Sequence, residues 1–232
     1  FNGSKFIPKA FSSGAVAVLC SDKSYKNKNN IIYVPSVRNA LSKISSEIAS
    51  NFKGKKILIT GSNGKTTTTN IISKSLPKCS STIKNFNNEI GLPISIMSAK
   101  KDSKYFVLEA GAAKKGDIEY LSKIVKPDIG IITNIELEHT DCYKDLNDLQ
   151  DAFIQFAKAI PFYGELIICI DSPGAQEIIP KIERPMTTYG RSRDAAYRAE
   201  NLRFHENKST YNVFRTEECL GEIQLNVPGE HN

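Results

Sequence analysis

The residues best suited to chemistry form a glycine-rich loop directly after a run of apolar residues. The loop and the residues that follow it read Gly61-Ser62-Asn63-Gly64-Lys65-Thr66-Thr67. Glycines let several backbone N–H groups point at one anion, and the positive end of a helix dipole favours the same anion. In this setting Lys65 is suited to the outer phosphates of a nucleotide, and the Thr66 hydroxyl is suited to Mg²⁺. The loop therefore predicts a nucleoside triphosphate site.

The loop departs from the general phosphate-loop pattern in its first half. That pattern places four residues between its two glycines, whereas only two separate Gly61 from Gly64. Ile59 stands where the first glycine of the pattern would be. A strand–turn–helix connection with a chance Gly-Lys-Thr is the alternative. We favour the phosphate site because a buried strand is expected directly before the glycines.

Two further groups that could hold a divalent cation follow apolar strands. Glu109 closes the apolar run 106–108, so it should lie at the carboxyl edge of the sheet, where open α/β folds bind ligands. His139 follows the strand expected at 129–133 by a short loop, at the same edge. Asn134 in that loop could position phosphate or substrate. The alternatives are a solvated or helix-capping acid, a structural histidine and an ordinary turn residue.

Alternation of apolar strands with helices predicts an α/β fold whose parallel sheet is covered by helices on both faces. The expected strands are 56–60, 105–108, 129–133 and 166–170. The expected helices begin at Gly64 and span 117–125 and 146–160. From about Ala195 onward apolar and polar residues alternate, so antiparallel strands are expected to extend the sheet. Residues 54–232 are thus expected to form one α/β domain that carries the glycine loop.

The first 53 residues are expected to form a separate, partial small α/β domain. A short helix at 6–12, strands at 15–19 and 31–34, and a longer helix follow one another here. The longer helix carries one apolar stripe, made of Val37, Leu41, Ile44 and Ile48. The chain begins with Phe1 and has no charged-then-apolar leader, so we expect a piece of a longer protein.

Composition excludes several classes of function. The net charge is +6, but the basic residues are scattered, so we expect no nucleic-acid partner. No apolar run approaches the roughly 18 residues of a membrane helix, so no membrane insertion is expected. The five cysteines are an odd set without a C-x-x-C pair, which favours reduced thiols and a cytoplasmic location. We also expect a monomer.

The shortened loop followed by threonines resembles the phosphate loop of the Mur ligase superfamily. Residues 1–136 resemble the MurE and MurF types through Phe6-Ile7-Pro8, 14–18, Asn87-Asn88-Glu89-Ile90-Gly91-Leu92-Pro93, Leu108-Glu109-Ala110-Gly111 and Thr133-Asn134-Ile135. Residues 137–232 resemble the MurC type through Glu138-His139-Thr140-Asp141, 160–164, 171–173, 188–190 and 228–232. These segments cover nearly the whole chain, which is therefore identified as a member of this superfamily.

The resemblance implies an ATP-dependent amide ligase of peptidoglycan precursor synthesis that uses ATP and Mg²⁺. Such an enzyme phosphorylates the carboxylate of a UDP-N-acetylmuramoyl substrate, and the amine of L-alanine or D-alanyl-D-alanine attacks the acyl phosphate. The implied catalytic residues are Lys65, Glu109 and His139, and the implied metal ligands are Thr66, Glu109 and His139. The implied ATP-binding residues are Gly61, Ser62, Asn63, Gly64, Lys65, Thr66, Thr67, Asn134, His231 and Asn232. The implied substrate-binding residues are Asn87 and Asn88.

The same resemblance implies that residues 1–53 are part of a UDP-sugar-binding domain and that residues 54–232 are the central ATP-binding domain. It also implies that a third, C-terminal domain is absent. We therefore expect this piece alone not to catalyse ligation. Several relatives carry a carbamylated lysine in the helix after the metal histidine, but here Phe153 takes that place and no lysine is assigned. The alternatives are a P-loop NTPase of another class, which would favour a full phosphate-loop pattern, or a non-catalytic ATP-binding fragment.

Overall fold

The computed structural model describes residues 3–136, 142–205, 207–227 and 229. The chain divides into two compact units, residues 1–44 and 45–232, which we treat separately. The division falls within helix α2 (Val37–Asn51), whereas the sequence places the domain boundary after this helix. The assignment of the first unit to a UDP-sugar-binding domain stays a prediction.

The first unit is a small assembly of short helices around two strands. It contains η1 (Gly3–Phe6), α1 (Ile7–Ser12), β1 (Val18–Cys20), η2 (Lys23–Tyr25) and β2 (Ile31–Tyr33), followed by the start of α2. Strands β1 and β2 pair in parallel. Strand β1 begins three residues later than predicted, after a turn at Gly14, whose φ is 93°. Strand β2 ends one residue earlier than predicted, before Val34 and Pro35.

The second unit is built on one nine-stranded sheet with the order β11-β10-β9-β8-β7-β6-β3-β5-β4. Its strands are β3 (Lys55–Thr60), β4 (Cys79–Ser81), β5 (Tyr105–Glu109), β6 (Ile129–Ile132), β7 (Glu165–Cys169), β8 (Met186–Gly190), β9 (Tyr197–His205), β10 (Lys208–Arg215) and β11 (Glu218–Leu225). Pairing is parallel from β4 to β9. It is antiparallel between β9, β10 and β11. The predicted parallel sheet with appended antiparallel strands is confirmed.

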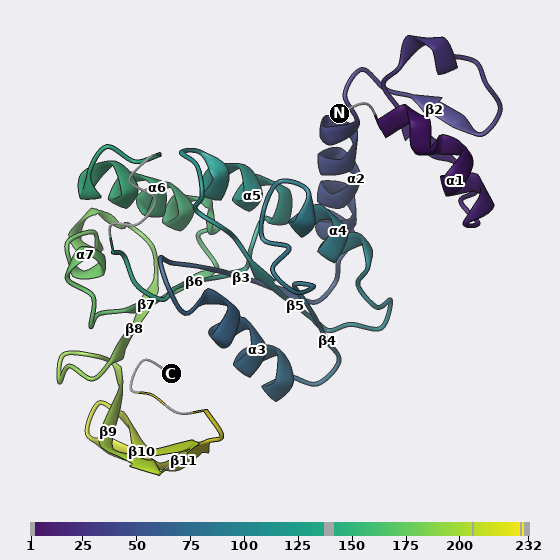
Figure 1. The fold of residues 1–232 in the computed structure, drawn as a ribbon. Coiled ribbons are helices and arrows are strands. Elements are labelled where there is room, and N and C mark those ends of the chain that lie inside the picture. Colours follow the sequence, from purple (N-terminus) through teal and green to yellow (C-terminus); the bar gives the residue numbers. More distant parts are fainter. Residues whose placement is uncertain (1–2, 137–141, 206, 228, 230–232) are drawn as a thin grey trace. The chain divides into compact units, whose positions relative to one another are not determined.

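Helices cover both faces of the parallel strands, as predicted (Figure 1). They are α3 (Lys65–Ser75), α4 (Gly91–Met97), α5 (Asp117–Val125), α6 (Leu146–Ala159) and α7 (Pro173–Gln176), with the short η3 (Ile179–Lys181). Helix α3 lies on one face, and α5 and α6 lie on the other (Figure 1). Ile57 and Ile59 of β3 pack in a cluster with Ile72 of α3, whereas Leu58 belongs to the larger cluster on the opposite face. This alternation shows that β3 is buried by helices on both of its faces.

Helix α2 contributes to this larger cluster through a different face from the predicted stripe. Ala49 is fully buried in the cluster, whereas Ile48 is 37% exposed. The buried positions Ser45 and Ala49 lie four residues apart and form a narrow small-residue face. The apolar pattern therefore predicts the helix but not the face that it buries.

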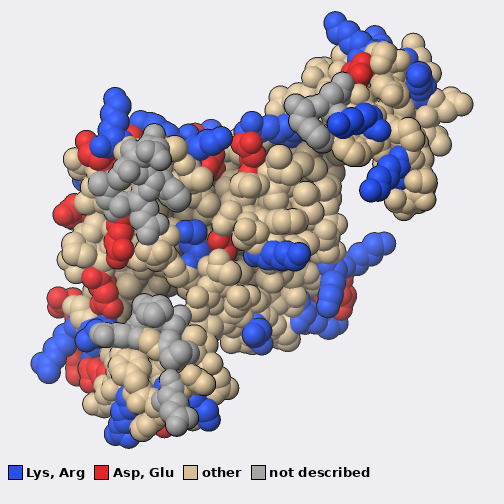
Figure 2. All heavy atoms as spheres, viewed as in Figure 1, with Lys and Arg blue, Asp and Glu red and all other residues tan. Residues whose placement is uncertain are grey.

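The visible surface carries basic side chains dispersed among neutral residues, without one large patch (Figure 2). None of the helices in the described part of the chain is long and apolar enough to cross a membrane.

Candidate nucleotide site

The glycine loop lies at the carboxyl end of β3, between β5 and β6 in the sheet. Gly61 has a φ of 145°, and a Cβ built there would lie 2.0 Å from Thr133 Oγ1. Gly64 caps the start of α3 with a φ of 79°. Both conformations favour glycine, and Gly61 also has no room for a side chain. The loop therefore needs Gly61 to pass close to the end of β6 and Gly64 to turn the chain into α3.

The segment after β6 holds the loop in place through several hydrogen bonds. The Asn63 N–H donates to Asn134 Oδ1 at 2.8 Å, and the Ser62 N–H donates to the Asn134 carbonyl at 3.1 Å. The Ser62 hydroxyl donates to the Glu136 carbonyl at 2.7 Å. The Thr133 hydroxyl lies 2.5 Å from the Asn63 carbonyl. Asn134, expected to position phosphate or substrate, thus shapes the loop itself.

Lys65 lies at the first position of α3, and its ammonium group is folded back over the loop. Its Nζ donates to the carbonyls of Gly61 at 2.6 Å and Ser62 at 2.7 Å. These bonds hold the positive charge beside the loop, where an anion bound to its N–H groups would lie.

A buried carboxylate meets the same loop from β5. The Thr66 hydroxyl donates to Glu109 Oε2 at 2.9 Å, and Asn87 Nδ2 donates to Glu109 Oε1 at 2.6 Å. The Glu109 N–H donates to Thr82 Oγ1 at 2.8 Å, and only 1% of Glu109 is exposed. The two side chains predicted as metal ligands, 43 residues apart in sequence, are therefore brought together.

These residues fit a hard divalent cation in the chemistry of their donors. A carboxylate and a hydroxyl oxygen are ligands that Mg²⁺ accepts, together with water and phosphate oxygens. The third predicted ligand, His139, lies outside the described residues, as do His231 and Asn232. Within the residues that the structure describes, no group of three His, Cys, Asp or Glu side chains could hold a metal ion. Thr66 and Glu109 thus supply two oxygen donors of a kind suited to Mg²⁺, and their role as metal ligands stays a prediction.

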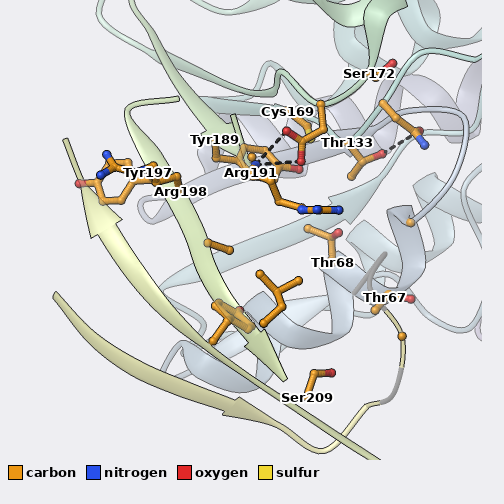
Figure 3. A pocket seen from close by; sticks show the side chains of 18 of the residues that line it. Thr67, Thr68, Thr133, Cys169, Ser172, Tyr189, Arg191, Tyr197, Arg198 and Ser209 are labelled. Carbon is orange, nitrogen blue, oxygen red and sulfur yellow. Dashed lines mark hydrogen bonds between the residues drawn. The ribbon is translucent and has the colours of Figure 1, made fainter. Parts of the chain in front are cut away.

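A cavity of about 790 Å³ opens beside the loop and extends to the antiparallel strands (Figure 3). Its loop side is lined by Asn63, Gly64, Thr67, Thr68, Thr133 and Asn134. Its central part is lined by Glu136, Cys169, Asp171, Ser172, Tyr189 and Arg191. The side formed by β9 and β10 includes Leu202, Phe204, Tyr211 and Val213. The loop side offers polar groups and a helix N-terminus, which suit phosphates. The opposite side offers apolar side chains, which suit a nucleobase.

Four of the residues predicted to bind ATP line this cavity, namely Asn63, Gly64, Thr67 and Asn134. Gly61, Ser62, Lys65 and Thr66 belong to the adjoining loop and helix start. Asn87 lies beside Glu109, whereas the Asn88 side chain accepts the N–H groups of Ile90 and Gly91 at the start of α4. Asn88 therefore has a helix-capping role, and its substrate role stays a prediction.

The central wall of the cavity is the part that the sequence reasoning missed. Asp171 accepts the Arg191 N–H with both carboxylate oxygens, at 2.8 and 2.9 Å. Burial raises the pKa of the Cys169 thiol, and burial together with the charges of Cys169 and Asp171 raises the pKa of Tyr189. Both groups are consequently neutral near pH 7. The signal that could have found this wall is the end of a strand followed by Asp171-Ser172-Pro173.

Comparison with known proteins agrees with this arrangement. The model of the Mur ligase middle domain family matches residues 59–232. UDP-N-acetylmuramate–L-alanine ligase of Myxococcus xanthus is 35% identical over 176 residues, which cover 76% of this chain and 36% of that protein. The chain thus spans little more than a third of the length of this curated relative.

Solved structures of MurF have the same fold. MurF from Acinetobacter baumannii superposes with a TM-score of 0.86 at 23% identity, over 98% of this chain and 50% of that chain. MurF from Thermotoga maritima, in complex with ADP, gives a TM-score of 0.84 at 26% identity, over 97% of this chain and 52% of that chain. The family resemblance predicted from the glycine loop is confirmed. Because the family model covers most of its length, the chain belongs to the Mur ligase family through the middle domain.

Proposed function

We propose that the protein is an ATP-dependent ligase of peptidoglycan precursor synthesis. It would join the carboxyl group of a UDP-N-acetylmuramoyl substrate to the amine of an amino acid or a dipeptide. The observation that carries the proposal is the 2.9 Å hydrogen bond between the Thr66 hydroxyl and the buried carboxylate of Glu109. It joins a phosphate loop to a carboxylate at the ligand-binding edge of the sheet. The relatives named above support the choice of reaction.

ATP and Mg²⁺ fit the residues present. Bound ATP supplies the phosphoryl group that activates the substrate carboxylate, and Mg²⁺ neutralises charge on the phosphates. The loop N–H groups and Lys65 would hold the phosphates, and Thr66 and Glu109 would hold the cation. Asn134 would keep the loop in its binding shape by accepting the Asn63 N–H. The protein's part is therefore positioning and electrostatic stabilisation, which phosphoryl transfer requires most.

The amine is either L-alanine or D-alanyl-D-alanine. L-alanine is supported by relatives that are 35% identical and are named for that amino acid. The dipeptide is supported by MurF structures, which superpose on almost the whole chain.

We propose a cytoplasmic location, because ATP and the UDP-linked substrate are soluble nucleotides. We also propose that Asn87 and Asn88 contact the UDP-N-acetylmuramoyl substrate. As a separate proposal, residues 1–53 belong to a UDP-sugar-binding domain.

The test has a binding arm and a reaction arm. Titration calorimetry of the 232-residue chain with ATP, in Mg²⁺ and in EDTA, should show ATP binding that Mg²⁺ strengthens. The longest protein that contains the chain is then given ATP, Mg²⁺, UDP-N-acetylmuramate or its tripeptide form, and each amine. Mass spectrometry should detect an amide product that depends on ATP.

Two results would contradict the proposal in different ways. ATP hydrolysis that is indifferent to the UDP-sugar and the amine would indicate a P-loop NTPase of another class. ATP binding without hydrolysis or product in the longest protein would indicate a non-catalytic binding protein. The Lys65→Ala variant controls for contaminating activity, since its loss of product ties the reaction to the glycine loop.

A further inference from the structure

We propose that Arg191 is a nucleotide-binding residue that contacts the phosphate chain of ATP from the wall of the cavity formed by β7 and β8. The proposal rests on the nucleotide site proposed above and adds to it a second positively charged side chain, besides Lys65. Neither the glycine loop nor the metal ligands include this residue.

The position of Arg191 follows from the sheet. Strands β6, β7 and β8 are neighbours and run parallel, so their carboxyl ends lie at the same edge as the glycine loop. Arg191 is the first residue after β8 and lines the cavity together with Thr68 and Thr133. Its side chain extends into the cavity in the direction of these two threonines (Figure 3).

The backbone at Arg191 is held firmly. Its N–H is bonded to both oxygens of Asp171, at 2.8 and 2.9 Å, and the Ser192 N–H donates to Asp171 Oδ1 at 3.3 Å. Asp171 follows the end of β7, so the carboxylate ties the turn after β8 to the neighbouring strand. This anchoring fixes the backbone of Arg191 at the cavity wall, so that ligand binding would have only its side chain to order.

The other arginine that lines the cavity, Arg198, is held within the antiparallel strands. Arg198 is 7% exposed, its Nε donates to Glu200 Oε1 at 2.6 Å, and its guanidinium lies 5.0 Å from the centre of the Phe214 ring. It also donates to the Thr216 carbonyl. Arg198 therefore stabilises the turn between β10 and β11 and the strands around it, whereas the Arg191 side chain is directed into the cavity.

The ligand group is assigned by the surroundings of Arg191. Thr67 and Thr68 lie in the first turn of α3, where the helix dipole favours negative charge. The apolar residues Leu202, Phe204 and Val213 lie on β9 and β10 and suit a nucleobase. A guanidinium offers several N–H donors in a plane that matches phosphate oxygens. The guanidinium of Arg191, which is directed toward the start of α3, is therefore better placed to bind the phosphates than the base.

The test compares nucleotides that differ only in their phosphates. The chain and its Arg191→Ala, Arg191→Lys and Arg193→Ala variants are titrated calorimetrically with ATP, ADP, AMP and adenosine. Arg193 is exposed, does not line the cavity and serves as the matched control. We expect Arg191→Ala to weaken ATP binding about tenfold, because a solvent-accessible charge-assisted contact is lost. Adenosine binding should be unchanged, and Arg191→Lys should restore part of the ATP affinity.

Each other outcome overturns a specific statement. Equal ATP affinity in Arg191→Ala and the unmodified chain would overturn the role of Arg191 and leave the proposed function standing. An equal loss of ATP and adenosine binding would overturn the assignment to the phosphates. If the unmodified chain binds no ATP, the proposed nucleotide site fails first and Arg191 with it. Thermal unfolding of each variant verifies that the fold is kept.

Discussion

The two sides of the cavity are built from different parts of one sheet. The glycine-loop side rests on parallel strands such as β3 and β5, whose last four residues are buried. The opposite side rests on the antiparallel strands β9, β10 and β11, and seven of the eight residues of β11 are exposed. The first side is fixed by a core on both faces, whereas the second side presents its strands to solvent.

The two sides therefore have different roles. The parallel strands contribute most of the stability, and the antiparallel strands shape the far wall of the cavity. On the parallel side the side chains that would hold phosphate and cation are bonded to one another, as Thr66 and Glu109 are. On the antiparallel side the lining residues are apolar or are held within the strands, as Arg198 is. We infer that most folding free energy lies with the parallel strands, and that β9–β11 can change sequence with little effect on the loop.

The largest expected effect is on stability and compares two leucines. Leu58 in β3 is fully buried, and Leu220 in β11 is 49% exposed. Leu58→Ala should lower the free energy of unfolding by about 2–5 kcal/mol, because it leaves a cavity in the core. Leu220→Ala should lower it by about 1 kcal/mol or less, since part of that side chain already contacts water. Urea unfolding followed by circular dichroism measures both values, and similar losses would break the proposed division.

The next effect is on nucleotide binding and compares two lysines of α3. Lys65→Ala should weaken ATP binding by about 1.5–3 kcal/mol, because a charged donor beside the loop is lost. Lys74 lies in the last turn of the same helix and is exposed, so Lys74→Ala should leave ATP affinity unchanged. Titration calorimetry gives both affinities. An unaltered Lys65→Ala titration would show that the loop binds phosphate without its lysine.

A smaller effect is expected on the metal dependence of binding. Glu109→Gln keeps the size of the side chain but removes its charge, so Mg²⁺ loses an anionic ligand. We expect the strengthening of ATP binding by Mg²⁺ to fall about tenfold, because one anionic ligand is worth on the order of 1.4 kcal/mol. ATP affinity in EDTA should not fall, because the variant removes a negative charge near the phosphates. Asp102→Asn, which removes an exposed carboxylate paired with Lys78, is the control. A Mg²⁺ dependence that Glu109→Gln does not alter would exclude Glu109 as a ligand.

The parallel side was also the part that the sequence predicted well. Unbroken apolar runs indicate β3, β5, β6 and β7, and the glycines indicate the turn into α3. Glu109 could be placed near Thr66 because both follow strands that end at one edge of a parallel sheet. These inferences need only local sequence patterns and the rule that parallel strands end at the same edge of a sheet.

The missed elements lack such local patterns. Strand β4 is the short segment Cys79–Ser81, and β8 contains two threonines and a half-buried tyrosine. Helix α4 contains Pro93 and is capped by Asn88, whose sequence context suggests ligand binding equally well. The position of Arg191 depends on a bond to Asp171, 20 residues earlier, which no spacing rule predicts. Tertiary contacts therefore determine these short elements and the position of Arg191, which the local sequence pattern does not predict.

The smallest expected effect concerns a buried phenol on the parallel side. Tyr143 is 1% exposed, and its hydroxyl donates to the Lys114 carbonyl at 3.2 Å. Burial, and then the charge of Asp117, raise the pKa of Tyr143 to about 12. At pH 7, Tyr143→Phe should cost about 1 kcal/mol, the value of one hydrogen bond.

The pH dependence of this variant gives the sharper test. The unfolded phenol ionises near pH 10, below its folded pKa, so the unfolded state loses its proton first as pH rises. The stability contributed by neutral Tyr143 is thus present below pH 10 and is lost as pH rises toward 12. Between pH 10 and 11 the unmodified chain should lose about 1 kcal/mol relative to Tyr143→Phe in urea unfolding. Parallel pH curves for the two proteins would mean that Tyr143 is solvated. The parallel side would then be less tightly closed around its site than its buried strands indicate.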